Sequence, residues 1–191
     1  TVEHPGFEAD DLIATFARRF GSVKDLRVVI LTGDMDTLQL VRDDKVVVRS
    51  LKKGVSDTTT YDEKAVLDRY GVMPQQVIDY KALVGDPSDN IKGVPGVGPK
   101  TATALLRKFG SLQGILDHLE GDAALKAKLF PWRAQALLCK RLVTLREDAP
   151  IAQNDLEALT ASFDTQALSK ELAKLGFKTL VERLRAMVSS K

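Results

Sequence analysis

The stretch that decides the fold is Val28-Val29-Ile30-Leu31, followed directly by Thr32-Gly33-Asp34-Met35-Asp36. Four consecutive apolar residues, bounded by polar ones and rich in β-branched types, are typical of a strand buried on both faces. Open α/β sheets bind their ligands at the carboxyl ends of such strands. We therefore expect Asp34 and Asp36 to border a site at the end of this strand.

Alternating helix and strand signals surround this strand, so residues 1–84 are predicted to form an α/β core with a mostly parallel sheet. Apolar residues at helical spacing predict a helix that begins at the first acidic cluster and ends at Gly21. The other elements expected in this part are a short helix at 37–41 and strands at 46–48 and 58–61. From Asp62 onward no further strand is expected. The predicted helices there cover 63–70, 74–84, 99–109, 111–118, 122–129, 132–146, 164–175 and 178–188.

A second informative segment is Gly93-Val94-Pro95-Gly96-Val97-Gly98-Pro99-Lys100-Thr101. A nucleotide-binding P-loop would need the lysine directly after Gly98, where Pro99 stands, so that interpretation fails. The segment is instead typical of two helices joined by a glycine turn, over about 74–109, whose amides face an anion. A plain tight connection remains the alternative. The residues expected to bind DNA phosphates are Gly93, Val94, Gly96, Val97, Gly98, Lys100 and Thr101.

The net charge of +2 conceals an uneven distribution along the 191 residues. Residues 91–146 carry 10 lysines and arginines against 3 acidic residues, whereas residues 1–90 carry 12 against 16. A basic segment that starts at the glycine turn suits a polyanion such as nucleic acid. A solvated helix face with spare lysines is the alternative explanation.

Seven carboxylates lie at predicted element ends, and like charges held together raise each other's pKa unless a cation compensates them. Oxygen ligands without histidine or cysteine suit Mg²⁺ or Mn²⁺ rather than Zn²⁺. Two such ions would clamp a phosphodiester during attack by water. Taken singly, each cluster is equally typical of a helix start or a turn. The candidate metal ligands and catalytic residues are Glu8, Asp10, Asp11, Asp34, Asp36, Asp86 and Asp89.

Together, Glu8-Ala9-Asp10-Asp11, Thr32-Gly33-Asp34-Met35-Asp36, Gly85-Asp86-Pro87-Ser88-Asp89-Asn90 and the glycine turn resemble, in order and spacing, the 5' nuclease domain of bacterial DNA polymerase I and related flap endonucleases. The resemblance implies a PIN-like 5' nuclease core followed by a helical lobe, residues 85–191, with a helix-three-turn-helix. It also implies one metal site at the first cluster and a second at the other two. The turn at 93–98 would grip duplex DNA, and its carbonyls can hold a K⁺ ion.

The resemblance further implies a 5'-3' exonuclease and flap endonuclease of replication and repair, acting on 5' flaps, nicks and 5' ends. The family domain opens with a strand bearing another catalytic aspartate and a helical arch, neither of which precedes Thr1, so a missing N-terminal segment and a polymerase module are expected partners. Two alternatives stay open. One is a catalytically incomplete, structure-specific DNA-binding module, and the other is an RNA-cutting PIN-like nuclease.

Composition excludes several other classes of protein. With 44% apolar and 28% charged residues the chain can bury a core, and we expect a soluble, monomeric, cytoplasmic protein without a membrane partner. The single cysteine, Cys139, is expected to be a packed, reduced thiol. The aromatic residues of the helical lobe are expected to pack in its core rather than to stack on bases. They are Phe109, Phe130, Trp132 and Phe163.

Overall fold

The computed structural model describes residues 1–53, 57–152, 156–160 and 164–189. It separates into two compact units, Thr1–Ile151 and Ala152–Lys191. The boundary expected after residue 84 separates the α/β part of the chain from the helical part, which is a different criterion. That division into domains stays a prediction.

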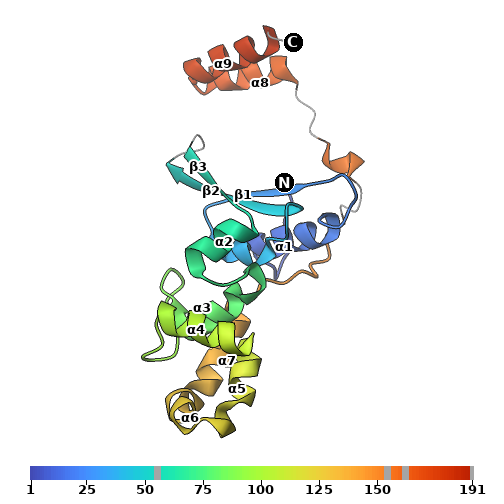
Figure 1. Ribbon diagram of the computed structural model, residues 1–191. Helices are drawn as coiled ribbons and strands as arrows, with labels where there is room; N and C mark the ends of the chain where they lie inside the picture. Colours follow the sequence, from blue (N-terminus) through green and yellow to red (C-terminus); the bar gives the residue numbers. More distant parts are fainter. Residues whose placement is uncertain (54–56, 153–155, 161–163, 190–191) are drawn as a thin grey trace. The chain divides into compact units, whose positions relative to one another are not determined.

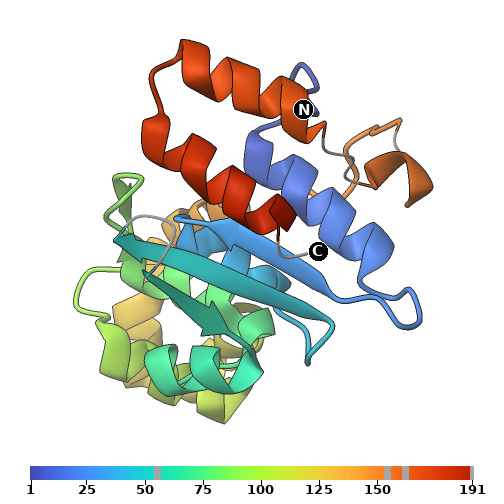
Figure 2. The same cartoon turned by 90° about the horizontal axis from the view of Figure 1, so that it is seen from above.

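The first unit opens with helix α1 (Ala9–Phe20), strand β1 (Val28–Thr32) and the 3-10 helix η1 (Met35–Leu40), followed by strands β2 (Val46–Lys53) and β3 (Asp57–Tyr61). The strands form one sheet in the order β1-β2-β3, with α1 packed against β1 (Figures 1 and 2). β1 and β2 are parallel, as predicted, whereas β2 and β3 are antiparallel, so the sheet is mixed. The α/β character of the core is confirmed.

The prediction that β1 is buried on both faces is wrong. Ile30 is buried, but its neighbours Val29 and Leu31 are 46% and 56% exposed. Successive side chains of a strand point to opposite faces, so Ile30 faces the core and its two neighbours face the exposed side of the sheet. The strand buried on both faces is the start of central strand β2, where Val46, Val47 and Val48 are almost fully buried.

The predicted helices of the first unit are present, and their ends follow local signals. The Asp62 side chain caps α2 by accepting from the Ala65 N–H, and Ser111 caps α5 by accepting from Gly114. Gly71 ends α2 in the left-handed conformation, at φ +71°. Helices α3 to α7 gather beyond the sheet (Figure 1). The elements are α2 (Glu63–Tyr70), η2 (Pro74–Gln76), α3 (Val77–Val84), α4 (Pro99–Phe109), α5 (Leu112–Asp117), η3 (Leu119–Gly121), α6 (Ala123–Leu129), η4 (Phe130–Trp132) and α7 (Arg133–Val143).

Two short elements contradict the expectation that no strand follows Asp62. Strands β4 (Gly85–Asp86) and β5 (Ile91–Lys92) pair antiparallel. This pairing brings the acidic segment that begins at Gly85 next to the glycine turn. A Cβ on Gly93 would lie 2.3 Å from the Gly85 nitrogen, so the two backbones approach more closely than any side chain allows. Pairing of this kind depends on backbone contact, which leaves no apolar pattern in the sequence.

One continuous apolar core links the sheet to the helices. Val48 of the sheet belongs to the same buried cluster as Leu83 of α3, Leu106 of α4 and Ile115 of α5. Cys139 of α7 belongs to it as well, and its Sγ contacts the Lys81 carbonyl oxygen at 3.4 Å. Burial raises the pKa of this thiol, as expected of a packed cysteine. The acidic loops are therefore held by elements that share one core.

The second unit contains η5 (Glu157–Leu159) and the helix pair α8 (Thr165–Lys174) and α9 (Lys178–Ser189). As predicted, the two helices are separated at Gly176, which adopts φ +76°. Phe163 lies outside the described residues. In the described ranges, no helix has the length and apolar character needed to cross a membrane.

The close approach of β4 and β5 predicts a large difference between two glycines of the turn. Gly93→Ala places its Cβ within 2.5 Å of three backbone atoms, so we expect a loss of about 2 kcal/mol or more, a fall in Tm of about 4–8 °C. A Cβ on Gly98 would meet no atom within 4 Å, and its φ of −93° suits any residue. The Tm of Gly98→Ala should therefore lie within about 2 °C of that of the parent protein. Thermal unfolding of both variants measures this difference. Equal melting temperatures would contradict the close packing of Gly93.

Candidate metal centre and nucleic-acid grip

Three of the seven predicted carboxylates form a compact cluster. Asp36 lies in η1, Asp86 in β4 and Asp89 in the loop between β4 and β5, and one oxygen from each lies within 4.8 Å of the others. Asp36 and Asp86 are buried, whereas Asp89 is exposed. An all-oxygen set that combines two buried carboxylates and an exposed one suits a hard divalent cation with an open coordination position. Asp36, Asp86 and Asp89 are the residues that would hold it.

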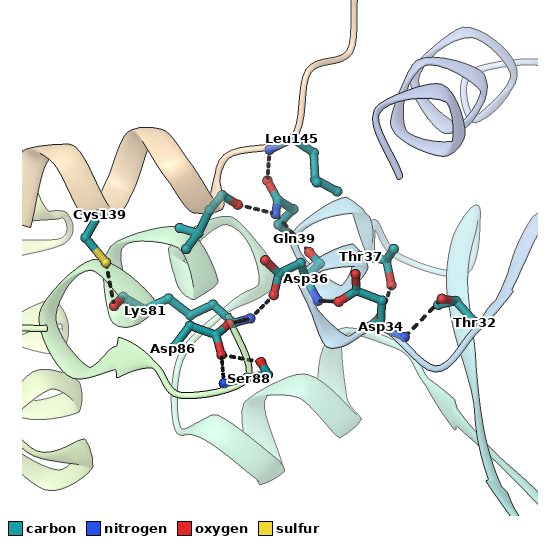
Figure 3. Close-up of polar contacts among 11 residues, drawn as sticks. Thr32, Asp34, Asp36, Thr37, Gln39, Lys81, Asp86, Ser88, Cys139 and Leu145 are labelled. Carbon is teal, nitrogen blue, oxygen red and sulfur yellow. Dashed lines mark hydrogen bonds and ion pairs between the residues drawn. The ribbon is translucent and has the colours of Figure 1, made fainter. Parts of the chain in front are cut away.

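The cluster contains a cation that the sequence did not reveal. Lys81, which is only 8% exposed, places its Nζ between Asp36 and Asp86 (Figure 3). The ammonium lies 2.5 Å from the Asp86 Oδ2 and forms a second ion pair with the Asp36 Oδ1. Burial acts to raise the pKa of Asp86, but hydrogen bonds from Lys81 and Ser88 and the charge of Lys81 lower it overall. Lys81 therefore keeps the Asp86 carboxylate ionised inside the protein.

The sequence offered only a weak signal for Lys81. It stands five positions before Asp86, which is not a helical pairing distance, and its other partner comes from a different element. The one indication was a charged residue directly before the apolar run Ala82-Leu83-Val84 in a buried helix.

A second side chain that the sequence analysis missed, Gln39, fixes the backbone that carries Asp36. Its Nε2 donates to the carbonyl oxygens of Asp36 and Val143, at 2.8 and 2.9 Å. Its Oε1 accepts from the Leu145 N–H at 3.1 Å (Figure 3). Gln39 thereby ties the acidic end of η1 to the end of α7.

The remaining carboxylates lie outside this cluster of three. Asp34 is exposed and caps η1 by accepting from the Asp36 N–H. Glu8 is exposed, whereas Asp10 is half-buried at the start of α1. Burial raises the pKa of Asp10, and the charges of Asp11 and Asp34 raise it further, against the lowering by the Asp11 N–H. The charge of Asp34 thus reaches Asp10. In the described part of the chain, however, no set of three ligands forms around these two residues.

Asp11 has a structural role at the start of α1. Its Oδ2 accepts from the Glu8 N–H at 3.2 Å, and its Oδ1 accepts from the Arg146 N–H at 2.7 Å. The carboxylate therefore caps α1 and fastens the segment after α7 to it. Its assignment as a metal ligand stays a prediction.

The glycine turn lines an open cleft of about 620 Å³, bordered by residues 90–98 with Val84 and Pro87. Val94 and Val97 are buried, and their N–H groups donate to the carbonyl oxygens of Leu83 and Val94, so both residues hold the turn in place. Gly96 adopts φ +73°, and α4 begins at Pro99 with no side chain capping it. Uncapped amides at a helix start favour an anion. Lys100 is exposed beside them.

The expectation that the lobe's aromatic residues pack in the core is wrong for two of them. Phe130 and Trp132, in η4, are 53% and 41% exposed, whereas Phe109 packs partly against the core. Pro131 lies between them and forces a one-turn 3-10 segment at the junction of α6 and α7, which leaves both rings outside.

Two family models match this chain in succession. Residues 1–71 match the N-terminal resolvase-like domain of the 5'-3' exonucleases, and residues 72–166 match their C-terminal SAM fold. The chain belongs to the 5'-3' exonuclease family. The predicted resemblance is confirmed, and so is the fold class, a nuclease core followed by a helical lobe.

Relatives of this chain include bacterial DNA polymerases I. The chain is 41% identical to that of Mycobacterium bovis over 189 residues and 41% identical to that of Bacillus subtilis over 181 residues. These alignments cover 96% and 93% of this chain but 20% of each polymerase. The chain thus spans about a fifth of the length of these relatives.

Solved structures of similar fold come from bacteriophage T5. A mutant of the T5 5'-exonuclease is 29% identical with a TM-score of 0.65, over 75% of this chain and 57% of that one. A T5 flap endonuclease, solved as a pseudo-enzyme-product complex with DNA and metal ions, is 29% identical with a TM-score of 0.64, over 75% and 52%.

The raised pKa of Asp10 predicts that its charge costs stability in the metal-free protein. A raised folded-state pKa contributes stability only at low pH, and the contribution is lost as pH rises through the folded value. We expect Asp10→Asn to melt at or above the parent protein at pH 7 in EDTA, with a difference that shrinks toward pH 4. Asp11→Asn is the control and should melt lower, because its carboxylate accepts two backbone N–H groups. A destabilised Asp10→Asn at pH 7 would contradict the electrostatic account.

Proposed function

We propose that this chain acts in a divalent-metal-dependent 5'-3' exonuclease and structure-specific flap endonuclease that hydrolyses DNA phosphodiesters. The observation that carries the proposal is the convergence of Asp36, Asp86 and Asp89 next to the glycine turn, since β4 and β5 connect the two directly. The T5 flap endonuclease complex with DNA and metal ions supports it by similarity. Participation in replication and repair, beside a polymerase module, is part of the proposal, and the similarity to DNA polymerases I supports it.

Asp36, Asp86 and Asp89, together with Asp34, would serve one divalent cation, Mg²⁺ or Mn²⁺, and Glu8, Asp10 and Asp11 would serve the other, directly or through water. Bound there, the cations would supply an activated water and stabilise charge on the phosphodiester. The protein's own contribution is positional. Gln39 fixes the Asp36 backbone, and the Ser88 N–H, 3.0 Å from Asp86 Oδ1, orients that carboxylate.

The glycine turn would hold the duplex beside the metal centre. The amides at the start of α4 and the ammonium of Lys100 suit backbone phosphates and read no bases. A K⁺ ion held by the carbonyls of the turn is also part of the proposal. DNA with 5' flaps, nicks or 5' ends is the proposed substrate.

Cleavage of a labelled 5' flap separates this function from a DNA-binding module. We expect Mg²⁺-dependent release of the flap by this chain, and a loss of about 100-fold in Asp86→Asn because a cation ligand is removed. Flap binding measured in Ca²⁺ should be retained in the variant. If the parent chain binds the flap in Ca²⁺ but does not cleave it in Mg²⁺ or Mn²⁺, the DNA-binding module is the better description.

The phosphate grip predicts a specific role for Lys100. Lys100→Ala should weaken binding to duplexes of unrelated sequence equally and reduce the salt dependence of binding by about one phosphate contact. Lys64→Ala is the control, because this exposed lysine pairs with Asp68 on α2. Its replacement should leave the affinity for duplex DNA unchanged. Fluorescence anisotropy across a salt series measures both. A sequence-dependent loss would contradict the phosphate grip, and unchanged duplex affinity in Lys100→Ala would favour the RNA-cutting alternative.

A further inference from the structure

The position of the Lys81 ammonium is the basis for an inference beyond the two cation sites. The carboxylate oxygens that contact it, Asp36 Oδ1 and Asp86 Oδ2, belong to the residues that would hold a divalent cation. A lysine ammonium and a divalent cation that approach the same pair of carboxylates repel each other. The two cations therefore compete for the same two carboxylates.

The surroundings of Lys81 restrict the conformations of its side chain. Its helix, α3, packs against α7 and α4, and its carbonyl oxygen contacts the Cys139 Sγ. Its side chain is 10% exposed, and those of Asp36 and Asp86 are 11% and 6% exposed. Buried carboxylates without a cation would repel each other and be protonated or pushed apart.

We propose that Lys81 is an internal counter-cation of the metal centre, which holds Asp36 and Asp86 together in the metal-free chain and leaves their oxygens when a divalent cation binds. This inference rests on the proposed function, because it requires the cluster to be a cation site. Lys81 is a positioning residue in this scheme. It keeps the site assembled at the cost of weaker cation affinity.

A second ion pair of α3, between a buried aspartate and a lysine whose side chain is 37% exposed, provides a control. Lys140 of α7 places its Nζ 2.7 Å from the Oδ1 of Asp79, a buried residue of α3. This pair joins α3 to α7, as Lys81 joins α3 to η1, but it takes no part in the acidic cluster. Loss of Lys140 should therefore affect stability alone.

The test measures cation binding and stability rather than cleavage. Ca²⁺ is titrated by isothermal calorimetry into the parent chain, Lys81→Met and Lys140→Met, and each is melted in EDTA and in excess Ca²⁺. We expect Lys81→Met to melt lower than the parent in EDTA, to bind Ca²⁺ about tenfold more tightly or better, and to recover most of its lost stability in Ca²⁺. Lys140→Met should lose stability in both buffers and bind Ca²⁺ like the parent.

The outcomes separate this inference from the proposed function. Saturable Ca²⁺ binding in the parent with equal or weaker affinity in Lys81→Met overturns the counter-cation role alone. Absence of saturable binding in both overturns the metal centre itself. If Lys81→Met does not fold, Ca²⁺ binding to Lys81→Arg is measured instead. This variant retains the positive charge, so it should bind Ca²⁺ no more tightly than the parent, and tighter binding would overturn the counter-cation role.

Discussion

The structure depends on one electrostatic constraint, which is the convergence of carboxylates from separate elements on one point. Asp36 follows β1, and Asp86 and Asp89 follow α3, so the core that packs η1 against α3 also presses negative charges together. Such charges stay ionised in a protein interior only beside a cation. In the metal-free chain that cation is Lys81, and in the proposed function it is a divalent metal.

The same packing couples the acidic cluster to the proposed grip on DNA. Gly85 and Gly93 let β4 and β5 approach closely, which places Asp86 at the start of the hairpin and the glycine turn at its end. The Val94 N–H donates to the Leu83 carbonyl at 2.8 Å and anchors the turn to α3. A phosphate backbone held at the turn would therefore lie at a fixed offset from the cation ligands.

What the sequence predicted correctly was local in origin. Asp62, Ser111 and Gly71 act within one turn of their own helices, so their caps could be read from neighbouring residues. What it missed depends on distant contacts. The exposure of one face of β1 depends on which elements cover the sheet, and the β4–β5 pair depends on the close approach of two backbones. Lys81 was missed because its partner Asp36 comes from another element, and Phe130 and Trp132 were misjudged because composition does not show which face of a junction is covered.

The most direct test of the central claim is a crystal structure of this chain soaked in Mn²⁺, with anomalous scattering used to locate the ion. The account predicts an anomalous peak at bonding distance from Asp36, Asp86 and Asp89, with the Lys81 ammonium moved away from the first two. A saturating soak that leaves Lys81 between Asp36 and Asp86, with no anomalous peak at the cluster, would contradict it.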